Sequence, residues 1–358
     1  MSIRVKVPGK LVLLGEYAVL KGADALVASV DRFVIADISV AKNDLTQISS
    51  NLTPSPLKFT IDKNGKIVPD QRQSEQLIST MDFALAIINK ICKHILESGF
   101  SIQPFDLKID TSQFYINTNK NKLGLGSSAA LTVALIVSVA NYNGAEKKLF
   151  TNEYDLFRFA RETHFSAQGK LGSGIDIAAS VFGGINVYNI KSSDYEERSQ
   201  QISPVSVLQD LFILPVWSGV SVSTLKLLSQ VEDYRSRHEE EYEETMSRLS
   251  TLSSSGCVTY AEKKRIDFLD IVQDYYEVLK NFSTKSKIPI ISDIHEKIAN
   301  IVYETGGIYK PSGAGGGDIG IAFCDSIKKL KNVKKELAEN KFETISLEIS
   351  TKGVVVDS

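Results

Sequence analysis

The sequence predicts an α+β protein built from two lobes. Its 358 residues exceed what one average domain core holds, which favours two linked units. Strand patterns dominate the beginning, helix patterns dominate the middle, and a strand–helix–strand pattern ends the chain. A polar stretch at 191–201 is the expected connection. We therefore place the division near residue 195, with a first lobe at 1–195 and a second lobe at 196–358.

The composition is that of a globular protein without a general affinity for anions. Apolar residues make up 43% of the chain and charged residues 23%. Lys and Arg number 41 against 43 Asp and Glu, so the net charge is −2 and no global field attracts nucleic acid or a membrane surface. Any anion must therefore be bound locally, and we expect neither a nucleic-acid nor a membrane partner.

Cysteines and apolar runs predict the compartment. Cys92, Cys257 and Cys324 are far apart and odd in number, which argues against a disulfide framework or a CxxC metal site. The apolar run at 11–14 is too short for a signal-peptide core, and no later stretch approaches the roughly 20 apolar residues that cross a bilayer. We expect a cytoplasmic protein, either monomeric or homodimeric.

The first lobe should begin as a sheet and continue as helices. Alternating or β-branched residues predict strands at 3–7, 25–40, 57–67 and 105–109, the third with a Lys-Asn-Gly turn. Apolar residues recurring every three or four positions, or runs of small helix formers, predict helices at 74–97, 129–140, 152–165 and 177–182. Gly-rich segments precede the second and the fourth of these helices.

The second lobe should combine long polar helices with a few strands. We expect one or two strands at 205–216, long helices at 223–253 and 260–282, and a β-α-β ending at 319–323, 326–339 and 344–349.

The first glycine-rich segment, 124–130, reads GLGSSAA and opens onto a predicted helix. Glycines allow the backbone to approach a ligand, and the free N–H groups of a helix N-terminus attract phosphate. Ser127 and Ser128 add hydroxyls for phosphate oxygens or Mg²⁺, and Lys122 adds a positive charge. The alternative is an ordinary helix cap.

The last glycine-rich segment, 312–318, reads SGAGGGD. A formal GxGxxG falls at Gly315, Gly317 and Gly320, but a dinucleotide fold requires a helix next, whereas the residues at 319–323 are strand-like. A Walker A motif is also missing from the sequence. We expect a loop pressed against a ligand or the opposite lobe, with a tight turn as the alternative.

The middle segment, 168–176, reads QGKLGSGID and places Lys170 and Asp176 around flexible residues. Asp176 could be a base, a metal ligand or a helix N-cap, and the cap is favoured if the segment is considered alone.

Together with 8–19, which reads PGKLVLLGEYAV, these three segments resemble in order and separation the motif set of the GHMP kinases. The resemblance implies an N-terminal lobe of ribosomal-protein-S5-like type, a C-terminal ferredoxin-like lobe, and ATP between them. Tyr17 where other members have His, the 168–176 segment and Asp318 are similar to the members that phosphorylate phosphomevalonate. The rival is a member that phosphorylates a hydroxyl, such as that of mevalonate.

The resemblance also implies roles for individual residues, with ATP and Mg²⁺ as cofactors. Lys10, Lys122 and Asp176 would be catalytic. The triphosphate would be held by Gly124, Leu125, Gly126, Ser127, Ser128 and Ala129, and Mg²⁺ by Ser128. The substrate would contact Lys10, Glu16, Tyr17, Ala18, Gln168, Lys170, Ser173, Ser223, Gly313, Ala314, Gly315, Gly316 and Asp318.

The implied acceptor changes what Asp176 must do. A hydroxyl loses a proton during attack, whereas a phosphomonoester, with a second pKa of about 6, is already mostly dianionic at neutral pH. We therefore expect Asp176 to orient Lys10 and the metal or substrate rather than to act as a base. A dianionic acceptor also needs cations, and Lys10, Lys122, Lys170 and Lys310 lie in or beside the motifs, the last two with a solvated loop lysine as the alternative.

Two segments depart from the family pattern or remain open. Mevalonate kinases carry a metal-binding Glu about a dozen residues before the Asp. In that region this chain has Glu162, a misplaced substitute, and His164, which we expect to be a helix histidine without a ligand role. Ser221, Ser223 and Thr224 resemble the segment by which the second lobe meets substrate, with a helix cap as the alternative.

Overall fold

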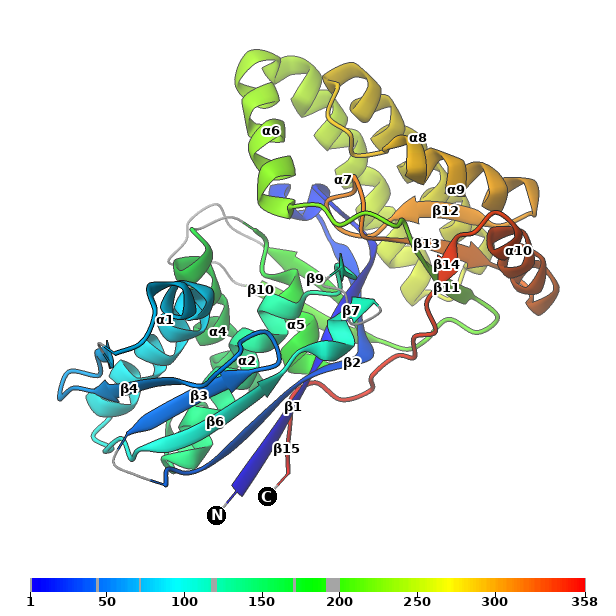
Figure 1. Ribbon diagram of the computed structural model, residues 1–358. Coiled ribbons are helices and arrows are strands. Elements are labelled where there is room, and N and C mark those ends of the chain that lie inside the picture. The colour runs from blue at the N-terminus through cyan, green and yellow to red at the C-terminus, as the bar shows by residue number, and fades with distance from the viewer. Residues whose placement is uncertain are drawn as a thin grey trace.

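The computed structural model has two lobes, as the sequence predicts (Figure 1). It describes residues 2–42, 45–70, 72–116, 121–169, 172–190 and 200–357. The predicted division near residue 195 and the predicted site residue Lys170 lie outside the described residues. Within the described part of the chain, no helix combines the length and apolarity needed to cross a membrane.

The first lobe is organised by a nine-stranded sheet in which β10, β9, β2, β6, β3, β4 and β5 are neighbours in that order, while β1 pairs with β2 and β15. Its strands are β1 (Ser2–Leu14), β2 (Ala25–Val40), β3 (Thr46–Ser50), β4 (Leu57–Ile61), β5 (Ile67–Pro69), β6 (Phe105–Asp110), β9 (Ile185–Ile190), β10 (Gln200–Val205) and β15 (Val355–Asp357). The strand predicted at 57–67 is a hairpin, because the Lys-Asn-Gly turn reverses the chain.

Strand β1 is much longer than the predicted 3–7. It pairs antiparallel with β2 from Ser2, opposite Ser39, to Leu14, opposite Leu26, with register shifts on the way. One shift falls between Pro8 and Gly9, because a proline lacks the N–H that a regular ladder needs and is tolerated at a bulge. The strand therefore continues past the proline into the predicted motif at 8–19.

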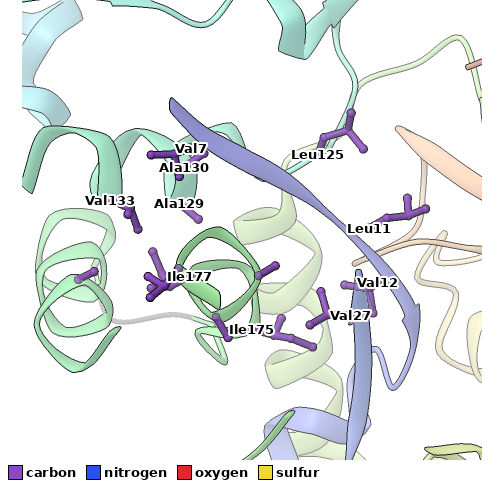
Figure 2. Packing of buried hydrophobic residues seen from close by; sticks show 14 of the residues in the cluster. Val7, Leu11, Val12, Val27, Leu125, Ala129, Ala130, Val133, Ile175 and Ile177 are labelled. Atoms are coloured by element: carbon purple, nitrogen blue, oxygen red, sulfur yellow. The ribbon is translucent and has the colours of Figure 1, made fainter. Parts of the chain in front are cut away.

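Helices pack on this sheet where the sequence predicts them. They are α1 (Glu75–Glu97), α2 (Ser127–Tyr142), α3 (Glu146–Leu149), α4 (Glu153–Gln168) and α5 (Ile175–Phe182), with a 3-10 turn η1 (Ala18–Lys21) after β1. Small residues let α2 lie close to its neighbours, and Figure 2 shows Ala129, Ala130 and Val133 of α2 near Val7 of β1 and Ile177 of α5. The four helices predicted for this lobe are confirmed.

The second lobe has a four-stranded antiparallel sheet in the order β12-β13-β11-β14. Its strands are β11 (Phe212–Trp217), β12 (Ile308–Pro311), β13 (Ile319–Cys324) and β14 (Glu343–Thr344), and its helices are α6 (Thr224–Arg237), α7 (Glu239–Ala261), α8 (Arg265–Ser286), α9 (Asp293–Glu304) and α10 (Ile327–Glu339).

Several predictions for the second lobe were wrong in detail. The helix expected at 223–253 is two helices, because His238 leaves the helical conformation with φ −138° and ends α6 while starting α7. Helix α9 and strand β12 were not predicted at all. The strand expected at 344–349 contributes only its first residue to the sheet of this lobe.

The end of the chain returns to the first lobe. Ile349 forms a bridge with Val30, and Arg4 and Lys6 of β1 pair with Asp357 and Val355 of β15. Figure 1 shows this tail running from the second lobe down beside β1, with both termini together. The chain thus connects the two lobes a second time.

Candidate active site

A cleft of about 560 Å³ lies between the lobes and brings the four predicted motifs together. One wall comes from β1, the 122–128 loop and the ends of α4 and α5. The other wall comes from the second lobe, at 221–225, 312–314 and Asp318. Segments more than 300 residues apart in the sequence therefore share one site.

The 124–128 loop has the geometry of an anion cradle. Gly124 and Gly126 have φ values of 73° and 78°, a region that glycine adopts without steric cost. Gly126 is the N-cap of α2 and has no side chain to satisfy the first N–H groups of the helix. Ser127 and Ser128 lie inside the first turn, so neither serine is the N-cap of the helix. Ala129 lies in the same turn but is fully buried in the core.

Strand β1 approaches this loop closely and delivers Lys10 to it. A Cβ on Gly9 would lie 2.7 Å from the Leu125 carbonyl oxygen, so only glycine permits the approach. The Lys10 N–H donates to that same oxygen at 2.9 Å. The backbone of the 124–128 loop therefore fixes the position of Lys10.

Lys10 and Asp176 form an ion pair within the cleft. The distance from Lys10 Nζ to Asp176 Oδ1 is 3.7 Å, and the lysine side chain is 8% exposed while the carboxylate is 35% exposed. Asp176 lies in the first turn of α5, and the N-cap of that helix is Gly174, so the cap interpretation of Asp176 is wrong. The carboxylate is free to face the cleft.

His164 belongs to the cleft, which the sequence analysis did not predict. Its Nε2 lies 3.2 Å from the Ser128 hydroxyl oxygen. Burial lowers the pKa of His164, and the nearby Asp176 carboxylate offsets only part of that effect. The signal was available, because His164 and Gln168 are four residues apart on α4 and thus share a face.

Glu162 lies on the other side of α4. Its carboxylate is 71% exposed and pairs with Lys90 at 2.6 Å, away from the cleft. Glu162 therefore does not replace the missing metal-binding glutamate. Among the described residues no group of three or more His, Cys, Asp and Glu side chains is arranged to hold a metal.

The oxygens of Ser128 and Asp176 still suit a hard cation such as Mg²⁺. This ion is commonly held by one or two protein oxygens together with the phosphates of a nucleotide, so a full cage of protein ligands is not required. Both residues line the same cleft beside the anion cradle.

Glu16 and Tyr17 lie on the cleft wall but use their polar groups to join the lobes. Glu16 Oε1 accepts from Lys310 Nζ at 2.5 Å, with side chains 2% and 0% exposed. Burial lowers the pKa of Lys310, while the Glu16 charge opposes the shift. The Tyr17 hydroxyl donates to the Ala314 carbonyl at 2.5 Å. Ala18 is buried in η1 and does not line the cleft.

Lys310 was wrongly grouped with the lysines that face a substrate. It is fully buried and does not line the cleft, so neither a phosphate contact nor a solvated loop lysine describes it.

The glycine run at 312–318 divides into two parts. Gly313 and Ala314 line the cleft, whereas Gly315 and Gly316 do not. A Cβ on Gly315 would lie 2.4 Å from the Ile290 carbonyl oxygen of the same lobe. The prediction that Gly315 and Gly316 contact the substrate was therefore wrong, because these glycines let the loop pack within its own lobe.

Asp318 lies against Gly124 of the 124–128 loop in the other lobe. A Cβ on Gly124 would lie 2.6 Å from the Asp318 Cβ. Burial raises the pKa of Asp318, and hydrogen bonds from the Ser221 side chain and the Val222 backbone, together with the charges of Lys10 and Lys122, oppose that shift.

The remaining predicted residues lie around the opening. Ser173 and Gln168 line the cleft, and the Ser173 carbonyl accepts from the Tyr188 hydroxyl at 2.7 Å. Ser223 also lines it while capping α6, since its Oγ accepts from the Lys226 N–H at 3.4 Å. Ser223 is thus the N-cap of α6 and also part of the cleft wall, so the two interpretations do not exclude each other. Lys122 is exposed at the mouth.

Comparisons with known proteins agree with this geometry. Residues 83–184 match the family model described as GHMP kinases N terminal domain. This stretch, which includes α2, α4 and α5, therefore matches the N-terminal domain of the GHMP kinases.

Among its relatives, this chain is similar to a phosphomevalonate kinase of Streptomyces sp. (strain CL190), with 26% identity over 89% of each chain. It is also similar to a mevalonate kinase of Archaeoglobus fulgidus, with 26% identity over 69% of each. Its fold matches that of Streptococcus pneumoniae phosphomevalonate kinase in complex with phosphomevalonate and AMPPNP, with a TM-score of 0.78, 20% identity and coverage of 98% and 99%.

Proposed function

We propose that this protein is a kinase that transfers the γ-phosphoryl group of ATP to (R)-5-phosphomevalonate, giving ADP and 5-diphosphomevalonate. The observation that carries the proposal is the buried Lys10, paired with Asp176 and held by the backbone of the glycine loop at the N-terminus of α2. The similarity to the Streptomyces phosphomevalonate kinase over 89% of each chain supports the choice of acceptor.

The nucleotide would lie along the 124–128 loop. The free N–H groups of the first turn of α2 would bind phosphate oxygens, as at other helix N-termini that begin with glycine. Lys122 would contact the triphosphate from the mouth of the cleft. Mg²⁺, held by Ser128 and Asp176 together with the phosphates, would neutralise part of their charge.

Lys10 would act at the transferred group. A buried ammonium group stabilises the charge that shifts between donor and acceptor oxygens, and phosphoryl transfer depends mainly on such positioning and charge neutralisation. Asp176 would hold Lys10 in place through the ion pair. Since a phosphomonoester acceptor is already mostly deprotonated at neutral pH, no base is required.

The acceptor would occupy the side of the cleft formed by the second lobe. Gln168 and Ser173 would approach it from one wall, and Ser223, Gly313, Ala314 and Asp318 from the other. Lys170, which lies outside the described residues, stays a proposed acceptor contact. Because Lys310 is paired with Glu16 in the protein interior, the number of lysines at the cleft no longer favours a phosphorylated acceptor by itself. The choice between a phosphorylated and a hydroxyl acceptor therefore depends on the similarity to relatives.

A second candidate is a kinase for a free hydroxyl, such as that of mevalonate. The similarity to the Archaeoglobus mevalonate kinase favours it, and Asp176 could then accept the hydroxyl proton.

A substrate panel distinguishes the two candidates. ADP release is measured with phosphomevalonate, mevalonate, galactose and homoserine as acceptors, at saturating ATP and Mg²⁺. We expect turnover with phosphomevalonate at least about a hundredfold above the others, since a site built around a charged group rejects an acceptor that lacks it. Turnover with mevalonate but not with phosphomevalonate would establish the second candidate. If none of the four acceptors caused ADP release, both candidates would be refuted.

A further inference from the structure

Helices α4 and α2 contact each other within the cleft through His164 and Ser128, and the proposed reaction assigns this contact no role. His164 Nε2 is 3.2 Å from Ser128 Oγ. The His164 ring is held edge-on by Phe83, with ring centroids 6.0 Å apart and an angle of 89° between the planes. The imidazole is 8% exposed, so few other orientations are open to it.

The chemistry of the two groups allows two arrangements. A neutral imidazole has one N–H donor and one lone-pair acceptor, and a hydroxyl has one proton and two lone pairs. If Ser128 donates to Nε2, its oxygen lone pairs face the cleft. If Nε2–H donates to Ser128, the hydroxyl proton is left to face the cleft. The tautomer of His164 therefore decides whether Ser128 offers a ligand a lone pair or a proton.

We propose that His164 is a positioning residue whose Nε2 accepts a hydrogen bond from the Ser128 hydroxyl. The Ser128 oxygen then presents its lone pairs to the Mg²⁺ ion of a bound nucleotide. The inference rests on the proposed function for the presence of that ion. A cation beside Ser128 favours this arrangement, because it attracts the oxygen end of the hydroxyl dipole and repels the proton. The proton then points toward α4, where Nε2 is the acceptor within reach.

The dependence of nucleotide affinity on Mg²⁺ tests this role. Binding of AMPPNP is measured by calorimetry with excess Mg²⁺ and again with EDTA. The Mg²⁺ effect is the dissociation constant in EDTA divided by the dissociation constant in Mg²⁺. Ser128→Ala should reduce this ratio about tenfold, the size of one lost hard-cation contact of roughly 1.4 kcal/mol. His164→Phe, which keeps the ring packed on Phe83, should reduce the ratio nearly as much.

Two further variants make the result specific. The double variant of Ser128→Ala with His164→Phe should show no greater loss than Ser128→Ala alone, because both changes remove the same contact. His164→Gln should keep most of the wild-type ratio, since the glutamine amide oxygen can accept a hydrogen bond from the Ser128 hydroxyl near the position of Nε2. His94→Phe is the matched control, because His94 stacks on Phe159 outside the cleft at 4.7 Å.

Three results would overturn the proposal. They are an unchanged Mg²⁺ effect in His164→Phe, losses that add in the double variant, or an equal weakening of AMPPNP binding with and without Mg²⁺. Wild-type protein that binds Mg²⁺-AMPPNP but phosphorylates no phosphomevalonate would refute the proposed function and leave this inference standing. Wild-type protein that gains no affinity from Mg²⁺ would refute the inference.

Discussion

At the scale of single residues, Lys10 shows how the surroundings of a charge define its role. The ammonium group is buried next to a partly exposed carboxylate at 3.7 Å, and the lysine backbone is fixed by the Leu125 carbonyl. A lysine held at both ends in this way is positioned before a ligand arrives, which reduces the reorganisation required during reaction.

This arrangement predicts unequal effects of removing the two charges. Lys10→Met keeps the apolar stem but removes the cation, so kcat with phosphomevalonate should fall at least about a hundredfold. Asp176→Asn removes the ion pair but keeps the shape and an oxygen that can contact Mg²⁺. Because the acceptor also needs no base, kcat should stay within about tenfold of wild type. Steady-state ADP release measures both. Complete inactivity of Asp176→Asn with an unchanged circular dichroism spectrum would contradict the organising role.

His295 predicts how stability changes with pH. It is fully buried between the Tyr309 hydroxyl and the Gly317 carbonyl, at 2.8 Å and 3.0 Å, and burial lowers its pKa to about 4. The unfolded state, with a pKa near 6.5, binds the proton more tightly. The free energy of unfolding should therefore fall as pH decreases from 6.5 to 4, by on the order of 3 kcal/mol.

Urea denaturation at several pH values measures this slope. His295→Gln should be nearly flat over the same window, whereas His94→Gln should keep the wild-type slope. A wild-type slope in His295→Gln would show that other groups cause the acid destabilisation.

At the scale of elements, the loop before α2 shows why particular glycines are required. Gly124 has a positive φ and also lies against Asp318 of the other lobe, while Gly144, after α2, has a positive φ of 68° and open space around its Cα. The two positions separate the cost of backbone strain from the cost of steric contact.

Alanine at these two glycines should therefore act differently. Gly144→Ala should lose about 1 kcal/mol of stability through the left-handed conformation alone, with ATP KM unchanged. Gly124→Ala adds a contact of 2.6 Å with the Asp318 Cβ, so it should lose a further 1–3 kcal/mol and raise the KM for ATP severalfold. Urea denaturation and initial rates at varied ATP measure the two quantities. Equal behaviour of the two variants would mean that Asp318 can move away without cost.

At the scale of the whole molecule, contacts at one end of the cleft join the lobes. Ser312 Oγ bridges the N–H and carbonyl of Val12 at 3.0 Å each, and the Glu16–Lys310 pair is buried beside it. The tail of the chain then returns to β1. Because these contacts are buried and polar on both sides, we infer that the lobes are rigidly joined at this end of the cleft.

Breaking the buried pair should be costly. Lys310→Met leaves the Glu16 carboxylate buried without its partner and should lower the free energy of unfolding by about 3–5 kcal/mol. Combining it with Glu16→Gln should recover much of that loss, because no buried charge remains. The control is Lys21→Met, whose pair with Glu243 also joins the lobes but is partly exposed, at 28% and 47%, and should cost under about 1 kcal/mol. Urea denaturation compares all three, and equal losses in both single variants would contradict the role of burial.

The sequence by itself determined the two-lobed α+β class, most helices of the first lobe and the segments that form the cleft. These features depend on local periodicity, on the conformational freedom of glycine and on the free N–H groups of a helix N-terminus, all of which act over a few residues. Ser128 was identified from these local features, whereas Lys10 and the role of Asp176 came from the resemblance to the GHMP kinases. The structure brings all three residues to one cleft.

Only the tertiary structure decided which of the predicted residues face the cleft. Lys310 and Glu16 carry charges that look suited to a substrate, but they neutralise each other because segments about 300 residues apart meet there. His164 contacts Ser128 only because α4 packs against α2 in the folded protein. Strand β15 likewise pairs with β1, at the opposite end of the chain. Burial and long-range contact set these roles, and neither is encoded in the local pattern of residues.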